Sequence, residues 1–96
     1  MKKFLVLSQG YKDPTPEIMA AWGKWFASLE GRMVDPGSPL GPGKEITHAG
    51  TKELPHGLES TSGYMMIDAE SLDDAMKVLQ GCPIITSLRV YEAMSH

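Results

Sequence analysis

A chain of 96 residues has room for one domain, and its 42% hydrophobic and 22% charged residues match an ordinary globular protein. This composition excludes a disordered chain and a membrane-spanning one. The formal net charge of −3, without any basic run, argues against nucleic acid, because phosphate binding needs a basic face. We therefore expect one soluble domain over residues 1–96, with neither a nucleic-acid nor a membrane partner.

The first predicted element is a buried strand over residues 4–8, a short apolar run that Gln9 and Gly10 close. The apolar core of a signal peptide needs about 7–15 residues, so this run is too short for one. We therefore expect a cytoplasmic protein.

A helix is predicted next, beginning after Thr15, whose hydroxyl can accept a hydrogen bond from the first free amides. Pro16 suits the first helical position, which needs no amide hydrogen, and Gly31 is the expected stop. The apolar residues recur every three or four positions and form one stripe: Ile18, Ala21, Trp22, Trp25, Phe26 and Leu29.

The middle of the chain predicts an interrupted second strand. It begins at residues 33–35 and runs into residues 36–43, where three prolines and three glycines exclude a regular central strand. A rigid loop or an irregular edge is expected there. Residues 44–48 then resume the strand, residues 49–51 form a turn, and residues 52–62, which lack apolar periodicity, form a surface loop with a mobile tip.

The last third predicts a strand, a second helix and a final strand. Residues 63–69 and 88–92 are the strands. Ser71 with a carboxylate three residues later, Asp74, is a variant of the capping box that opens a helix. Gly81 and Pro83 end this helix.

This order of elements predicts an α+β fold, a ferredoxin-like βαββαβ unit whose antiparallel sheet carries two helices on one face. Strand alternation places Tyr64 and Met66 on the face opposite Met65 and Ile67. A bulky, uncovered sheet face is a liability in a monomer. We therefore expect a homodimer that pairs the two open sheet faces.

Four segments resemble, in order, the YCII-related family. They are Met-Ala-Ala-Trp-Gly-Lys-Trp-Phe (19–26), Val-Asp-Pro-Gly-Ser-Pro-Leu-Gly-Pro (34–42), residues 63–75 from Gly-Tyr to Leu-Asp-Asp-Ala, and Gly-Cys-Pro (81–83). The resemblance runs from Phe4 to about Ala93 and is weakest over residues 50–62. It implies a single YCII-like domain whose ferredoxin-like protomer pairs into a dimeric α/β barrel.

The family's best-known members carry a His soon after the first strand and a later Asp, a pair suspected of acid–base work. Some relatives are dehalogenating lyases that act on aromatic substrates. Residues 9–13 of this chain contain no His. A related branch carries an Asp-Gly-Pro-Phe motif. This chain does not match it, since the nearest stretch, residues 54–58, reads Leu-Pro-His-Gly-Leu.

Two residues are candidates for proton transfer. Asp35, before Pro36 and Gly37, is either a turn residue bonded to its own backbone or a general base at the mouth of a cleft. His48 is the one His on a predicted strand and a candidate proton shuttle. Because the three His residues share no ligand spacing and Cys82 stands alone, we expect no metal and no cofactor. Cys82 is interpreted as a packed small hydrophobe.

Four residues are candidate ligand contacts. Trp22 packs in the core or borders a pocket between helix and sheet, and Tyr64 packs at a dimer interface or lines the barrel. Ser38 lies among glycines and has two interpretations. Either Ser38 and the backbone amides around it bind an anionic ligand, or the segment forms ordinary turns. Lys44 either forms an ion pair with a ligand carboxylate or is a solvated lysine on a strand.

Two functions are compatible with these residues. The first, which the missing His favours, is non-catalytic binding of a small molecule in an apolar cleft of the dimeric α/β barrel. The second is a cofactor-free lyase or isomerase in which Asp35 or His48 moves a proton on a small aromatic or acidic substrate. The second requires Asp35 or His48 to open onto the same cavity as Trp22 or Tyr64.

Overall fold

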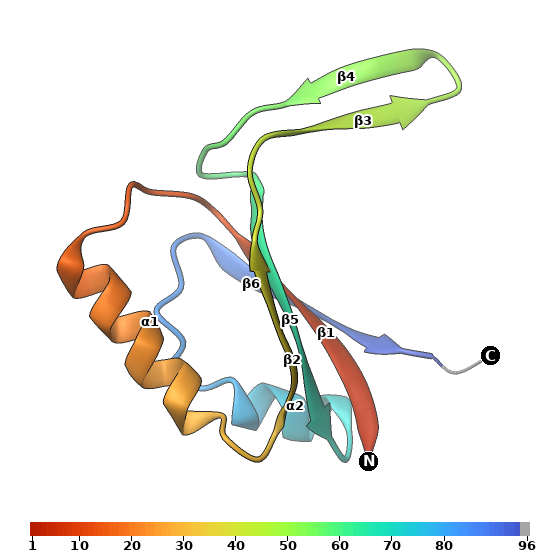
Figure 1. Cartoon of the computed structure of the whole chain (residues 1–96). Coiled ribbons are helices and arrows are strands. Elements are labelled where there is room, and N and C mark those ends of the chain that lie inside the picture. Colours follow the sequence, from red (N-terminus) through yellow and green to blue (C-terminus); the bar gives the residue numbers. More distant parts are fainter. Residues whose placement is uncertain (95–96) are drawn as a thin grey trace.

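A four-stranded antiparallel sheet organises the computed structural model, which describes residues 1–94 (Figure 1). The strand order is β2-β5-β1-β6. The strands are β2 (Met33–Pro39), β5 (Thr61–Ala69), β1 (Lys2–Gln9) and β6 (Ser87–Ala93). Helices α1 (Pro16–Ser28) and α2 (Leu72–Val78) both lie on one side of the sheet. The expected α+β class, the antiparallel sheet and the two helices are confirmed.

Both helices begin at the residues that the sequence marks as caps. The Thr15 hydroxyl accepts a hydrogen bond from the Ile18 amide at 3.2 Å, with Pro16 in the first turn. Ser71 accepts one from the Asp74 amide at 3.1 Å. Within the described residues, neither helix combines the length and the apolar character needed to cross a membrane.

The hydrophobic core lies between the helices and the sheet. It contains the buried side chains of Phe4 and Val6 from β1, Met65, Ile67 and Ala69 from β5, Trp25 and Leu29 from α1 and its end, and Ala75 and Leu79 from α2 and its end. On β5 these residues alternate with Tyr64, Met66 and Asp68, which stay partly exposed. The expected alternation of the two faces is therefore confirmed.

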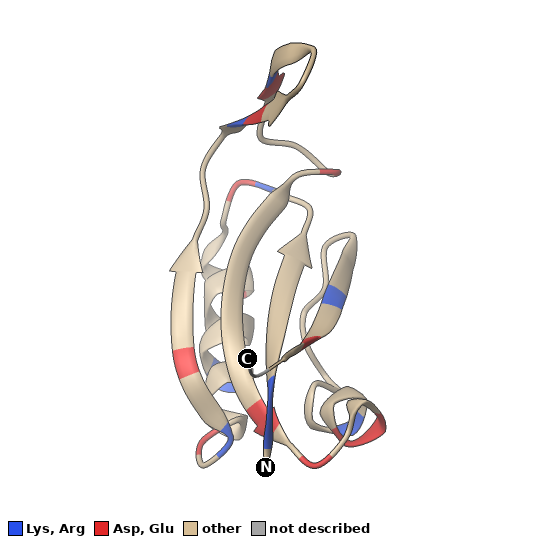
Figure 2. Ribbon diagram, turned by 90° about the vertical axis from the view of Figure 1, so that its right-hand side faces the viewer, with Lys and Arg blue, Asp and Glu red and all other residues tan. Residues whose placement is uncertain are grey.

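The sheet face turned away from the helices, the open face, carries two rows of bulky side chains. Leu5 lies opposite both Met66 and Tyr91, and Leu7 lies opposite both Tyr64 and Arg89. Directly paired residues of an antiparallel ladder share a face. Figure 2 looks onto this face, and the central stretches of β1 and β5 carry no charged residue there.

Strand β2 is an irregular edge, as its prolines predict. Its pairing with β5 shifts between Met33 and Asp35 and again between Asp35 and Ser38. Gly37 has φ +68°, and a Cβ atom there would collide with the main-chain oxygen of Tyr64.

The expectations for residues 44–62 are partly wrong. Strands β3 (Gly43–Thr47) and β4 (Gly50–Leu54) form a separate two-stranded hairpin, whose turn is His48–Ala49. His48 thus lies in a turn and not on a strand, and β4 occupies residues 50–54, which were expected to be the end of the turn and the start of the loop. Every residue of β3 and β4 is exposed. Because neither face of the hairpin is buried, the sequence of β4 does not alternate between apolar and polar residues, and this alternation is the signal by which a strand is predicted.

The turn that follows β4 is tied to the sheet end. His56 stacks on Tyr11 with ring centroids 3.9 Å apart, and its Nε2 lies 2.7 Å from the Leu40 carbonyl oxygen. The Gly10 amide donates to the Ser60 carbonyl at 2.7 Å. The third His, His96, lies outside the described residues.

Two isoleucines that differ in burial allow a test of this core. Ile67 is fully buried, whereas Ile84 is 53% exposed. We expect Ile67→Ala to lower the free energy of unfolding by about 2–5 kcal/mol, because it removes buried methyl groups and leaves a cavity. Ile84→Ala should cost less than half as much. Urea titration followed by circular dichroism measures both, and equal costs would contradict this core.

Candidate functional site

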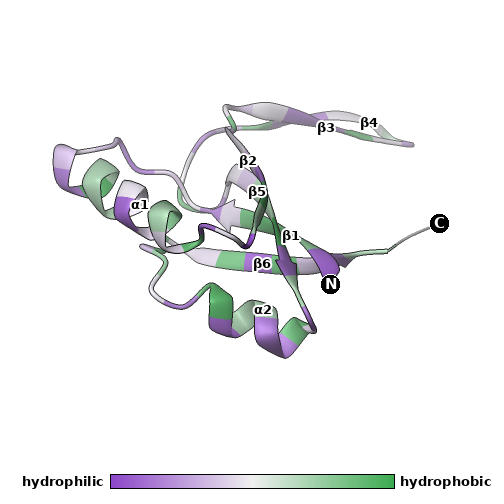
Figure 3. Cartoon of the chain, turned by 60° about the horizontal axis from the view of Figure 1, so that its bottom comes forward, coloured by the Kyte–Doolittle hydropathy of each residue, from purple (hydrophilic) through white to green (hydrophobic). Residues whose placement is uncertain are grey.

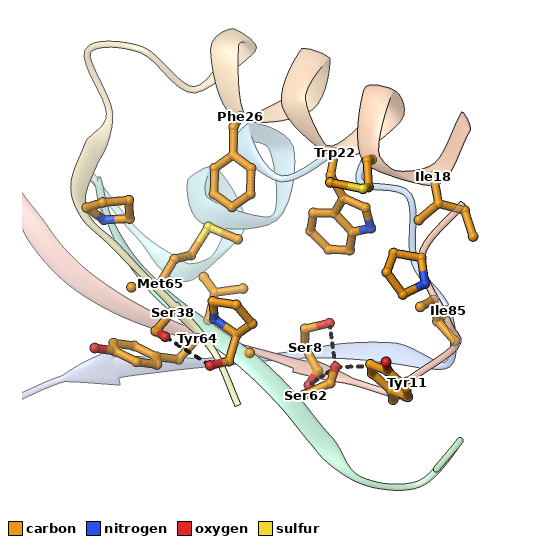
Figure 4. A pocket seen from close by; sticks show the side chains of 18 of the residues that line it. Ser8, Tyr11, Ile18, Trp22, Phe26, Ser38, Ser62, Tyr64, Met65 and Ile85 are labelled. Atoms are coloured by element: carbon orange, nitrogen blue, oxygen red, sulfur yellow. Dashed lines mark hydrogen bonds between the residues drawn. The ribbon is translucent and has the colours of Figure 1, made fainter. Parts of the chain in front are cut away.

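A cavity of about 440 Å³ separates the N-terminal half of α1 from the sheet (Figure 4). The C-terminal end of the helix is anchored by Trp25 and Leu29, which are 5% and 1% exposed. Trp22 and Ile18, about one and two turns before Trp25, are only partly buried. Volumes of this size are within the range of small-molecule sites.

The sizes of the side chains on the sheet explain why the N-terminal half of α1 does not pack closely against it. Under the anchored end, the strands present bulky Phe4 and Ile67. Toward the other end, Ser8 pairs with Gly63, so two small residues lie where bulky ones would fill the space. The cavity therefore comes from the order of large and small residues along β1 and β5.

The walls of the cavity are largely apolar. Helix α1 contributes Ile18, Met19, Trp22 and Phe26, the sheet contributes Val6, Met65, Pro36 and Pro39, and flanking segments contribute Pro14 and Ile85. Figure 4 shows Trp22 and Phe26 extending from α1 toward Met65 and the strands. Such a surface favours a ligand with a flat or compact apolar body.

The polar groups of the lining include two donors without a partner among the described residues. The Ser62 hydroxyl donates to the Gly10 carbonyl at 2.6 Å and lies 3.4 Å from the Ser8 hydroxyl, so these two hydroxyls are hydrogen-bonded to each other. Trp22 Nε1 lacks an acceptor within residues 1–94, whereas Trp25 Nε1 donates to the Gln80 carbonyl at 3.3 Å. Lys12 forms no ion pair in the same part of the chain. The lining therefore offers donors to a ligand that carries acceptor oxygens.

The structure brings three predicted ligand contacts to this cavity. Trp22, Ser38 and Tyr64 all belong to its lining. The ring of Tyr64, however, points away from α1 (Figure 4), as expected from its alternation with buried Met65. Tyr64 therefore borders the cavity only at the level of the strand, while its ring joins the open face.

Lys44, Asp35 and His48 lie elsewhere. Lys44 is exposed on the hairpin, where its Nζ is 3.3 Å from a carboxylate oxygen of Glu53. Asp35 is exposed, and its carboxylate accepts a hydrogen bond from the Gly37 amide at 2.8 Å, which is the turn role. His48 is exposed in the hairpin turn. Neither candidate for proton transfer lines the cavity that Trp22 borders.

Several lining residues escaped the sequence analysis as ligand contacts, among them Ser8, Tyr11, Lys12 and Ser62. Tyr11 and Lys12 follow β1 and were visible only as a connection to the helix. Ser8 carried one available signal, because it continues the inward-facing positions of Phe4 and Val6 with a small polar residue.

Two groups outside the cavity have displaced pKa values. A hydrogen bond from the Glu70 amide and a 3.2 Å contact with Arg32 lower the pKa of Asp74. The contact with Arg32 links the residue before β2 to α2. Burial raises the pKa of Cys82 to about 12. Cys82 packs against the core, in agreement with its interpretation as a small hydrophobe. Among the described residues, no group of three or more His, Cys, Asp or Glu could hold a metal ion.

Comparisons with known proteins add no assignment. A scan of protein-family models, a search of curated proteins and a search of solved structures each found no match. The resemblance to the YCII-related family therefore stays a prediction from the sequence.

The raised pKa predicts that Cys82 is slow to react. Because the thiolate is the nucleophile, a pKa near 12 leaves far less thiolate at pH 8 than the ordinary value of 9.0 does. We expect iodoacetamide to alkylate the folded chain at least about a hundredfold more slowly than the chain in urea. Mass spectrometry over time measures both rates. Similar rates in the two states would show that Cys82 is accessible and reactive.

Proposed function

We propose that this chain binds a small, flat, largely apolar molecule that carries acceptor oxygens, such as an aromatic carboxylate, in the cavity under α1. The observation that carries the proposal is the combination of apolar walls with two donors that have no partner within residues 1–94. They are the indole N–H of Trp22 and the ammonium group of Lys12, and the Ser8 hydroxyl, which is paired with Ser62, lies beside them in the lining. An oxygen-bearing ligand would satisfy these donors while its body covers the aromatic walls.

Binding without catalysis is favoured over the lyase or isomerase alternative. That alternative needed Asp35 or His48 at the cavity, and both side chains are exposed away from its lining. General acid–base catalysis requires the group to reach the reacting proton within hydrogen-bond distance or through one water.

The proposed setting is a ferredoxin-like protomer of the YCII-related type, paired into a dimeric α/β barrel in the cytoplasm. The order β2-β5-β1-β6, with both helices on one side, supports the protomer. The rows built on Leu5 and Leu7 support pairing through the open face, because a second copy would remove them from water. A lone thiol such as Cys82 needs no oxidising compartment.

Binding is tested with two probes that share a ring and differ in charge, 2-naphthoate and 2-naphthylmethylamine. We expect isothermal titration calorimetry to show several-fold tighter binding of the carboxylate, because Lys12 and the donors favour an anion. Met19→Trp should weaken naphthoate binding at least tenfold, since Met19 lines the cavity and the larger ring fills it.

The matched control is Met76→Trp on α2, because Met76 is also exposed, 49% against 63% for Met19, and lies outside the lining. Asp35→Asn and His48→Gln should also bind naphthoate as the unchanged protein does. If Met19→Trp and Met76→Trp lower the affinity for naphthoate equally, or if neither probe binds the unchanged protein, the cavity is refuted as the binding site.

Pairing through the open face is tested with Tyr91→Glu. Tyr91 is 54% exposed in the single chain, so the substitution should leave the protomer folded while placing two charges in the interface. We expect light scattering to give twice the chain mass for the unchanged protein, and Tyr91→Glu to raise the dimer dissociation constant at least tenfold.

Leu72→Glu, at a position 51% exposed on α2, is the control and should leave the dimer intact. A single chain mass for the unchanged protein at micromolar concentration would remove the dimer from the proposal.

A further inference from the structure

The β3–β4 hairpin, here called the arm (residues 43–54), stands apart from the rest of the chain. Within residues 1–94 its two strands pair only with each other, and every residue of both is exposed. In Figures 1 and 3 the arm reaches out on the side of the sheet away from α1 and α2. It therefore projects over the space in front of the open face.

The arm lacks the contacts that usually stabilise a hairpin. Isolated two-stranded hairpins are marginally stable in water and need a third strand or a packed face. Its Lys44–Glu53 ion pair is exposed at both ends, and such pairs contribute little. Ile46, 82% exposed, is an apolar side chain on its surface without any cover. A stable arm needs packing that this single chain does not provide.

The surface of the whole chain leads to the same conclusion. The chain exposes 6789 Å², whereas a compact monomer of 10.5 kDa exposes about 5,400 Å². Its radius of gyration is 14.5 Å, against about 12.5 Å for a compact chain of this length. The excess surface, about 1,400 Å², exceeds the roughly 800 Å² that each partner buries in a standard interface.

We propose that the arm clasps a second copy of this chain, with Ile46 packed against the partner. The inference rests on the dimer proposed above and adds the segment that holds it. A body docked on the open face lies beneath the arm, and two-fold symmetry gives each subunit one arm over the other. The arm's charges are two lysines and two glutamates, Lys44, Lys52, Glu45 and Glu53, so its net charge is zero and attracts no strongly charged partner.

The test uses two arm variants and one control in the full chain. Ile46→Asp places a charge at the proposed contact, and a shortened arm replaces residues 45–52 by Asn-Gly, which closes a two-residue hairpin turn between Lys44 and Glu53. Glu45→Gln changes the neighbouring residue, whose side chain lies on the other face of β3. Sedimentation of a dilution series gives the dimer dissociation constant of each protein, and circular dichroism checks the fold.

We expect Ile46→Asp and the shortened arm to raise the dissociation constant at least roughly tenfold, and Glu45→Gln to stay within twofold. Hydrogen exchange of the arm amides should slow when the unchanged protein is concentrated above its dissociation constant, because only the dimer covers the arm. An unchanged dissociation constant in either arm variant, or arm exchange independent of concentration, overturns the clasp.

The experiment also separates failure of the clasp from failure of the dimer. An unchanged protein that sediments as a single chain at all concentrations refutes the dimer and the clasp together. A stable dimer that neither arm variant weakens refutes the clasp alone and leaves pairing by the open face. Naphthoate binding is read separately in either case, since no arm residue lines the cavity.

Discussion

The uneven packing of α1 on the sheet is the constraint on which the site depends. Trp25 and Leu29 pack the C-terminal end of the helix onto bulky side chains of the sheet, whereas the small residues Ser8 and Gly63 leave a cavity under the other end. Close packing makes this arrangement decisive, because a void larger than a few water molecules forms only where side chains are too small to fill it. The same helix is therefore a core element at one end and the roof of a cavity at the other.

Two further surfaces of the chain have no cover in the protomer. The open face carries Leu5, Leu7 and their neighbours on β5 and β6, and the arm extends past this face with Ile46 in water. A small domain has little stability to spare, so partly exposed rows of bulky side chains and an unsupported hairpin both favour association. A single partner, a second copy of the chain, would account for both.

Much of the secondary structure could be predicted because its causes are local. Thr15 and Ser71 cap the helices, the stripe of α1 recurs with the helical period, and β5 alternates between buried and partly exposed residues. Strand β4 could not be predicted in this way, because a strand exposed on both faces has no alternation to reveal it. For the same reason His48 was placed on a strand when it belongs to the turn of that hairpin.

The candidate site likewise combines features that the sequence predicts with features that only the tertiary structure shows. From the sequence alone came the two helices, the strands of the sheet, the two-faced pattern of β5 and the place of Trp22 on the inner stripe. Only the tertiary structure decided that Ser8, Tyr11, Lys12 and Trp22 surround one cavity and that Asp35, Lys44 and His48 lie outside it. Caps and periodicity act between residues a few positions apart, whereas a cavity is formed by side chains from distant segments, whose separation depends on how the whole core packs.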